Sequence, residues 1–137
     1  MFRVLLSTAA ITTLTAGLLA TAPAAIASGG GADASASAAA RNSGSCSGRS
    51  MWNLKAKPDN GRIQVEFEVD SNVVGQTWNV KITDNTVVVL QRQATTTAPS
   101  GSFTVSRVVR NRAGVDHFVA RAANPKTGET CVGRVAL

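Results

Sequence analysis

The sequence predicts an all-β fold, a seven-stranded Greek-key β-sandwich that follows a signal peptide and a flexible linker. Three observations predict it. Residues 62–70 and 77–83 alternate apolar and polar side chains with a period of two, as strands with one buried face do. Turn-forming residues separate seven segments of this kind at regular spacing. No helical period of about 3.6 residues follows residue 27.

The 137 residues allow one domain, and the N-terminal part differs in composition from the rest. Residues 1–27 begin with one basic side chain, Arg3, continue as a short apolar stretch and end in small residues at Ala27, which predicts a cleaved secretory signal. Residues 28–45 are nearly all Gly, Ala and Ser, so we expect a disordered linker. The folded domain is then expected over residues 46–137. We expect the protein to be secreted or to stay in the cell envelope, without a transmembrane segment after cleavage.

The predicted strands follow one another with short turns between them. Residues 50–57 and 62–70 are expected to form a hairpin, because the Asn60-Gly61 pair between them tolerates positive φ. The segment at residues 86–94 alternates poorly and is expected at a sheet edge. Arg107 occupies an inward position of the next strand, so we expect a β-bulge there or a strand that leaves the core. The full set is residues 50–57, 62–70, 77–83, 86–94, 102–110, 115–123 and 130–137.

The large aromatic side chains of the domain are predicted to lie in the core, because all of them fall on the inward side of the alternation. The outer faces then offer no aromatic surface on which sugars or nucleic-acid bases could stack, and no specific nucleic acid is expected as a partner. The aromatic residues are Trp52, Phe67, Trp78, Phe103 and Phe118.

Cys46 and Cys131 bracket the predicted domain. In an exported chain, two widely separated cysteines are expected to form a disulfide rather than a metal site or a redox pair. One histidine and two oxidised cysteines leave no ligand set for zinc. The aspartates in the turns, Asp59, Asp70 and Asp84, lack the spacing of a calcium loop and are common turn residues. No metal and no cofactor is expected.

The span from residue 103 to residue 131, FTVSRVVRNRAGVDHFVARAANPKTGETC, resembles the E strand, E–F corner, F strand and F–G loop of immunoglobulin-like domains. Phe118, Ala120 and Asn124 match positions of that F strand, and Trp78 matches the buried tryptophan of strand C. Phe118 stands where the family has tyrosine, and the inter-sheet cysteine pair is missing, so the resemblance is to the architecture shared with fibronectin-like domains. The chain is also similar to small secreted bacterial proteins. The resemblance implies a sandwich and no particular activity.

No catalytic residue is predicted. Asp116 adjoins His117, the only histidine, but neighbouring residues of a strand point to opposite faces, so Asp116 cannot orient its ring. Glu66 and Glu68 share a face at roughly 7 Å, a spacing that overlaps that of an inverting glycosidase pair. They lie beside lysines on a flat, solvated face, which favours a surface role. We expect a protein that is not an enzyme; a small hydrolase acting at strand-end loops is an alternative.

The charge of +6 favours anionic partners. Four arginines fall on one predicted hairpin, residues 102–123, and arginine binds carboxylate and phosphate bidentately. A charged surface that resists aggregation is the competing interpretation. We expect a secreted, non-enzymatic binding or structural module whose partner is an anionic polymer or an extracellular protein. An exported protease inhibitor that presents residues 95–101 or 124–129 is a further alternative. The arginines are Arg107, Arg110, Arg112 and Arg121.

Overall fold

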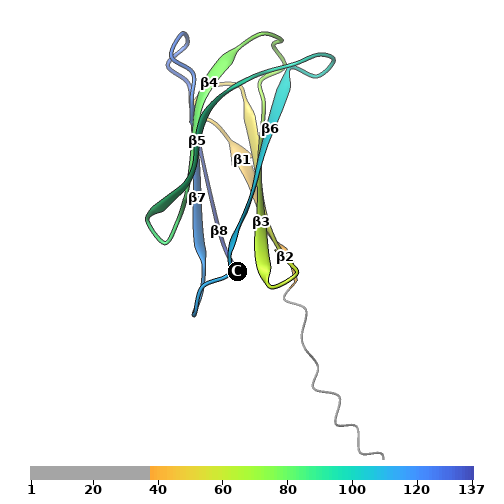
Figure 1. The fold of residues 1–137 in the computed structure, drawn as a ribbon. Helices are drawn as coiled ribbons and strands as arrows, with labels where there is room; N and C mark the ends of the chain where they lie inside the picture. The colour runs from red at the N-terminus through yellow and green to blue at the C-terminus, as the bar shows by residue number, and fades with distance from the viewer. Residues whose placement is uncertain (1–37) are drawn as a thin grey trace, which may run out of the picture. The chain divides into compact units, whose positions relative to one another are not determined.

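The computed structural model describes residues 38–137, which form two antiparallel four-stranded sheets packed as a sandwich (Figure 1). The strand orders are β1-β2-β3-β6 and β5-β4-β7-β8. The all-β sandwich is confirmed, with eight strands instead of the expected seven. The predicted signal, residues 1–27, lies outside the described residues. The strands are β1 (Ala40–Ser45), β2 (Met51–Asp59), β3 (Arg62–Asp70), β4 (Thr77–Asp84), β5 (Val87–Thr95), β6 (Ser102–Arg110), β7 (His117–Ala123) and β8 (Thr130–Ala136).

The additional strand, β1, corrects the expected linker, because the linker was predicted to run to residue 45. Its backbone pairs with β2 from Ala40 opposite Ala56 to Ser45 opposite Met51. The composition of this segment predicted disorder because it contains little apolar bulk. In the structure, pairing with β2 orders it through backbone hydrogen bonds. The indole Nε1 of Trp52 also donates to the Ser45 carbonyl oxygen at 3.2 Å.

Connections that cross between the two sheets follow β3, β5 and β6. The strand directions place four connections at the same end of the sandwich, which we call the loop end. They are residues 46–50, 71–76, 96–101 and 124–129. The predicted hairpin of residues 102–123 is wrong, since β6 pairs with β3 while β7 pairs with β4 and β8. The Asn60-Gly61 turn is confirmed, with φ of 49° and 75°.

The core lies between the inner faces of the two sheets and contains the predicted aromatic side chains. Trp78 is fully buried, and its ring centroid lies 6.4 Å from that of Phe103. The other core side chains come mainly from the inward positions of β2, β3, β4 and β7, where burial alternates with the expected period of two. The largest fully buried apolar residues are Trp78, Phe67, Phe118, Leu54, Ile63, Ile82, Val65, Val69, Val80 and Val105.

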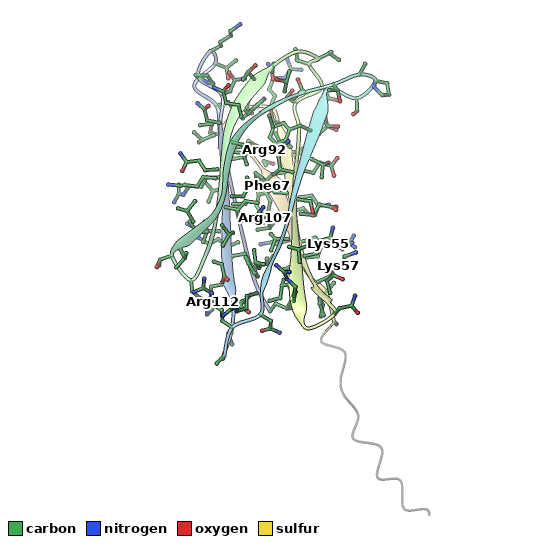
Figure 2. The ribbon with its side chains drawn as sticks, in the orientation of Figure 1. Lys55, Lys57, Phe67, Arg92, Arg107 and Arg112 are labelled. Carbon is green, nitrogen blue, oxygen red and sulfur yellow. A yellow bond between two sulfur atoms is a disulfide. The ribbon has the colours of Figure 1, made fainter. Side chains whose placement is uncertain are left out.

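At Arg107 the structure has neither the β-bulge nor the departure of the strand from the core that the alternation suggested. The register between β3 and β6 runs without a bulge, with Arg107 opposite Val65, and Val109 further along is buried again. The side chain is nevertheless exposed, because β6 is an edge strand beside the other edge strand, β5. In Figure 2, Arg107 and Arg92 of β5 project into the space between these two ribbons.

The disulfide between Cys46 and Cys131 is formed, with an S–S distance of 2.01 Å. It joins the β1–β2 connection to β8, and so it links one sheet to the other at the loop end. Trp52 packs nearby against Gly133, where a Cβ atom would lie 2.7 Å from the indole ring. Cystine and indole together close this side of the sandwich.

Replacing Trp78 with alanine should lower the free energy of unfolding by about 3–5 kcal/mol, because the change removes a fully buried aromatic ring from a closely packed interior. Urea unfolding of the variant measures the loss. In a Trp52→Phe background the remaining tryptophan should emit at the short wavelengths of a buried indole. A loss under about 1 kcal/mol, or emission typical of an exposed indole, would contradict this packing.

Replacing both cysteines with serine should lower the melting temperature by more than about 10 °C. The bond spans 85 residues, and on the chain-entropy model a loop of that size stabilises by at most about 4.6 kcal/mol. Thermal melts of both proteins, with a thiol titration of the unfolded and unreduced wild type, measure the effect. Coinciding melts, or two free thiols in the wild type, would show that the cross-link does not hold the sheets together.

Candidate functional site

The four arginines of the predicted anion site do not share one surface. Arg107 lies at the gap between β5 and β6, whereas Arg110, opposite Arg62, is on the outer face of the sheet β1-β2-β3-β6. Arg112 lies in the β6–β7 connection and pairs with a buried carboxylate. Arg121 faces outward from β7 on the other sheet. The four arginines therefore lie in four different environments. Two are on β6, one is in the β6–β7 connection, and one is on β7 in the other sheet.

A different group of cations gathers around Arg121. On β4, Lys81 is directly opposite Arg121, and Arg134 of β8 lies one diagonal step further across the sheet. All three side chains are exposed and point away from the core. Directly opposed residues of neighbouring strands lie about 4.5–5.5 Å apart at Cβ, so Lys81 and Arg121 are close together. Arg134 is a diagonal neighbour of Arg121, and such neighbours lie about 7–8 Å apart. We call Lys81, Arg121 and Arg134 the basic face.

The basic face contains no carboxylate. Four of the described acidic residues, Asp59, Glu66, Glu68 and Asp70, follow the outward positions of β2 and β3 on the opposite side of the sandwich. Lysines share that side, for Lys55 is directly opposite Glu66. The two outer faces thus differ in kind: one mixes both signs of charge and the other is basic only.

A shallow hollow of about 500 Å³ lies on the basic face. Its walls include the Lys81 and Arg121 side chains and two glutamines of β5, Gln91 and Gln93. The Gln93 amide Nε2 donates to Asn79 Oδ1 at 3.1 Å, which orients polar groups beside the cations. The hollow therefore combines positive charge with amide donors, a combination that suits oxyanions.

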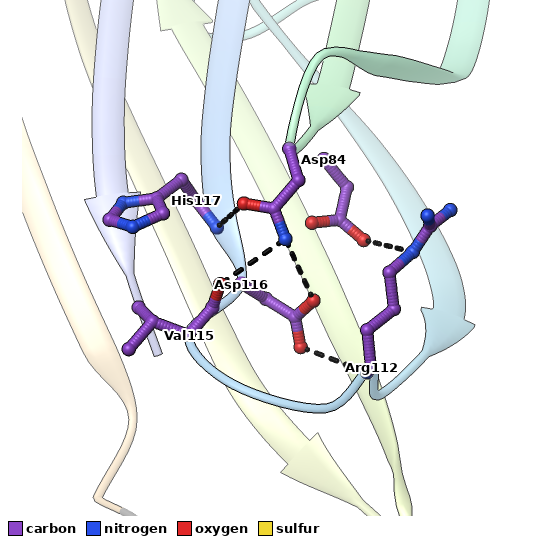
Figure 3. A network of polar contacts seen from close by, with 6 residues as sticks. Asp84, Arg112, Val115, Asp116 and His117 are labelled. Carbon is purple, nitrogen blue, oxygen red and sulfur yellow. Dashed lines mark hydrogen bonds and ion pairs between the residues drawn. The ribbon is translucent and has the colours of Figure 1, made fainter.

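A second polar cluster lies at the opposite end from the loops, between the ends of β4 and β7 (Figure 3). Asp84 is fully buried, and it forms an ion pair with Arg112, whose Nε is 3.4 Å from Oδ2. Neither carboxylate oxygen of Asp84 accepts a hydrogen bond. Asp116, also fully buried, accepts from the Arg112 backbone N–H at 3.2 Å and from Asn85 Nδ2 at 3.5 Å.

Burial raises the pKa of Asp84 above its ordinary value of 3.8, and the neighbouring Asp116 carboxylate raises it further. The Arg112 guanidinium and His117 act in the opposite direction. This cluster fastens the β4–β5 turn to the β6–β7 connection, since Asn85 Oδ1 also accepts from the His117 backbone N–H at 3.1 Å. Because both carboxylates are buried and the hydrogen bonds join two connections, the cluster is typical of a structural contact rather than of a solvated site.

His117 is exposed while Asp116 is buried, so the expectation that they point to opposite faces is confirmed. Neither of the two hollows described contains His117. Among residues 38–137, no group of three or more potential metal ligands gathers, and no helix is long and apolar enough to cross a membrane.

Sequence reasoning missed Asp84 as a buried residue and treated it as a turn former. The alternation contained the signal, because Asp84 continues the inward series of Trp78, Val80 and Ile82. It also missed Lys81 and Arg134, whose proximity to Arg121 depends on strand order and register. The loops proposed for an inhibitor, residues 95–101 and 124–129, both lie at the loop end.

Comparison of the chain with known protein families, with curated proteins and with solved structures finds no match. The function must therefore be inferred from the geometry of the chain itself.

Replacing Asp84 with asparagine should change how stability depends on pH. Because folding raises the pKa of Asp84, the folded state holds this proton more tightly than the unfolded chain. Its contribution to the free energy of unfolding is therefore greatest below the unfolded value near 3.8 and declines as pH rises through the folded pKa.

Urea unfolding from about pH 3 to pH 7 tests this difference. The free energy of wild type minus that of Asp84→Asn should fall as pH rises. It should fall more steeply in an Arg112→Ala background, which lacks the opposing cation. A difference that is constant or rises with pH would contradict the burial of an ionisable group at this position.

Proposed function

We propose that this chain is a secreted, non-enzymatic binding module that recognises anionic groups on an extracellular or cell-envelope polymer through its basic face. The carrying observation is the opposition of Lys81 and Arg121 on neighbouring strands with no carboxylate on that face. Like charges directly opposite each other cost stability. An anionic ligand would remove this cost and convert it into binding energy.

The geometry favours an extended polyanion over a single small ion. The three cations come from three adjacent strands, β4, β7 and β8, so they form a row across the sheet. Adjacent strands are about 4.8 Å apart, and a flexible chain of phosphate, sulfate or carboxylate groups could follow such a row. Arg121 and Arg134 can each bind an oxyanion bidentately, whereas Lys81 acts as a point charge.

The strand order supports an immunoglobulin-like or fibronectin-like assignment within this proposal. The adjacency of β4, β7 and β8 is that of strands C, F and G in such domains, and β2, β3 and β6 correspond to A, B and E. The Cys46–Cys131 disulfide supports export, because such bonds persist in oxidising compartments. These likenesses support a binding module but do not identify a ligand.

Retention on immobilised heparin, an anionic polymer, should decrease strongly for Lys81→Glu with Arg121→Glu. The matched control is Lys57→Glu with Arg110→Glu, which makes the same change in net charge on the outer face of β2 and β6. Wild type and control should elute at similar salt concentrations, and the basic-face variant should elute earlier. If both variants lost retention equally, net charge alone would explain the result, and the proposal would be contradicted.

A further inference from the structure

The loop end contains a groove of about 690 Å³, which is larger than the hollow on the basic face. Three connections line it: residues 47–50 from the β1–β2 connection, residues 71–73 and 76 from β3–β4, and residues 127–129 from β7–β8. Ligand pockets in proteins commonly have volumes of roughly 300–1,000 Å³. This groove is separate from the basic face, since the two have no lining residue in common.

The groove walls are held by contacts within the protein, so a ligand would have little chain to order. The buried Thr96 hydroxyl accepts from the Gln76 backbone N–H at 2.9 Å and fixes the β3–β4 connection to the base of the next loop. The Glu129 carboxylate accepts from the Ser50 backbone N–H at 2.7 Å. Gly48 permits this approach, because a Cβ there would lie 2.7 Å from the Glu129 carboxyl carbon.

Three features of the groove remain without a partner. Arg49 is exposed, and no described carboxylate lies within ion-pair distance of it. Gln76 lines the groove, and its buried Oε1 accepts no hydrogen bond; rotation of the amide toward the groove would let this oxygen accept one from a ligand N–H. Val73 exposes about half of its side chain at the rim. No aromatic ring lines the groove, which excludes the base stacking on which single-stranded nucleic acids depend.

We propose that the loop-end groove binds the carboxyl terminus of a peptide. Arg49 pairs with the terminal carboxylate, Gln76 accepts a backbone N–H, and Val73 contacts an apolar side chain of the peptide. A carboxylate, an amide N–H and an apolar group in one short ligand match the three unpartnered features together. Capture of a terminal carboxylate is an established mode of peptide recognition.

The test is an NMR titration of the ¹⁵N-labelled full chain with a random pool of N-acetylated tetrapeptides that carry a free carboxyl terminus. Amide shifts should concentrate in residues 47–50, 71–76 and 127–129. The same pool with amidated carboxyl termini should bind about tenfold or more weakly, because the charge-assisted contact is lost. Arg49→Gln should cause a similar loss, and Arg62→Gln, a surface arginine at the opposite end, should cause none.

Two results would overturn the proposal. One is the absence of groove shifts with the free-carboxylate pool at millimolar concentration. The other is equal binding of the free and amidated pools, with or without Arg49. Shifts that map instead to Lys81, Arg121 and Arg134 would assign the carboxylate to the basic face and would also overturn the groove as the peptide site. The Arg49 side chain is exposed, so its variant should fold normally.

Discussion

The covalent and packing contacts along one side of the sandwich hold the two sheets in a fixed relation. The Cys46–Cys131 bond and the indole of Trp52 both bridge the strand pair β1-β2 to β8. A domain of this size buries a modest fraction of its surface, so a cross-link between the layers adds a large share of its stability. The same bond anchors the loops at one end, where the groove lies.

The other side of the sandwich is not cross-linked, and it is protected by charge. The adjacent edge strands β5 and β6 place Arg92 and Arg107 on inward positions, opposite the core residues Val80 and Val65. Arginine stems can cover apolar surface while their guanidinium groups stay in water. Inward-pointing charges at an edge also oppose pairing with another chain. Arg107 thus lies at a sheet edge, whereas Arg121 lies on the outer face of the other sheet, between β4 and β8.

The sequence contained most of the fold because the period of two is strong in β2, β3, β4 and β7, and because a chain with two cysteines allows one pairing within itself. It did not reveal β1, whose order comes from pairing with β2 and from Trp52 rather than from its own composition. The basic face was only partly accessible. Arg121 could be singled out, but Lys81 and Arg134 are 40 and 13 residues away in the chain and meet it only through the strand order. Because β6 and β7 follow each other in the sequence, a hairpin was predicted between them. In the structure the connection after β6 crosses to the other sheet.

One outer face carries both signs of charge and the other carries only basic groups, so mapping where an anion binds tests recognition by the basic face most directly. Inorganic tripolyphosphate can be titrated into the ¹⁵N-labelled full chain at low ionic strength, where screening is weak. The amide shifts should concentrate on β4, β7 and β8 around Lys81, Arg121 and Arg134, and should decline as salt is added. Shifts concentrated on the outer face of β2, β3 and β6, or spread evenly over both faces, would contradict recognition of anions by the basic face.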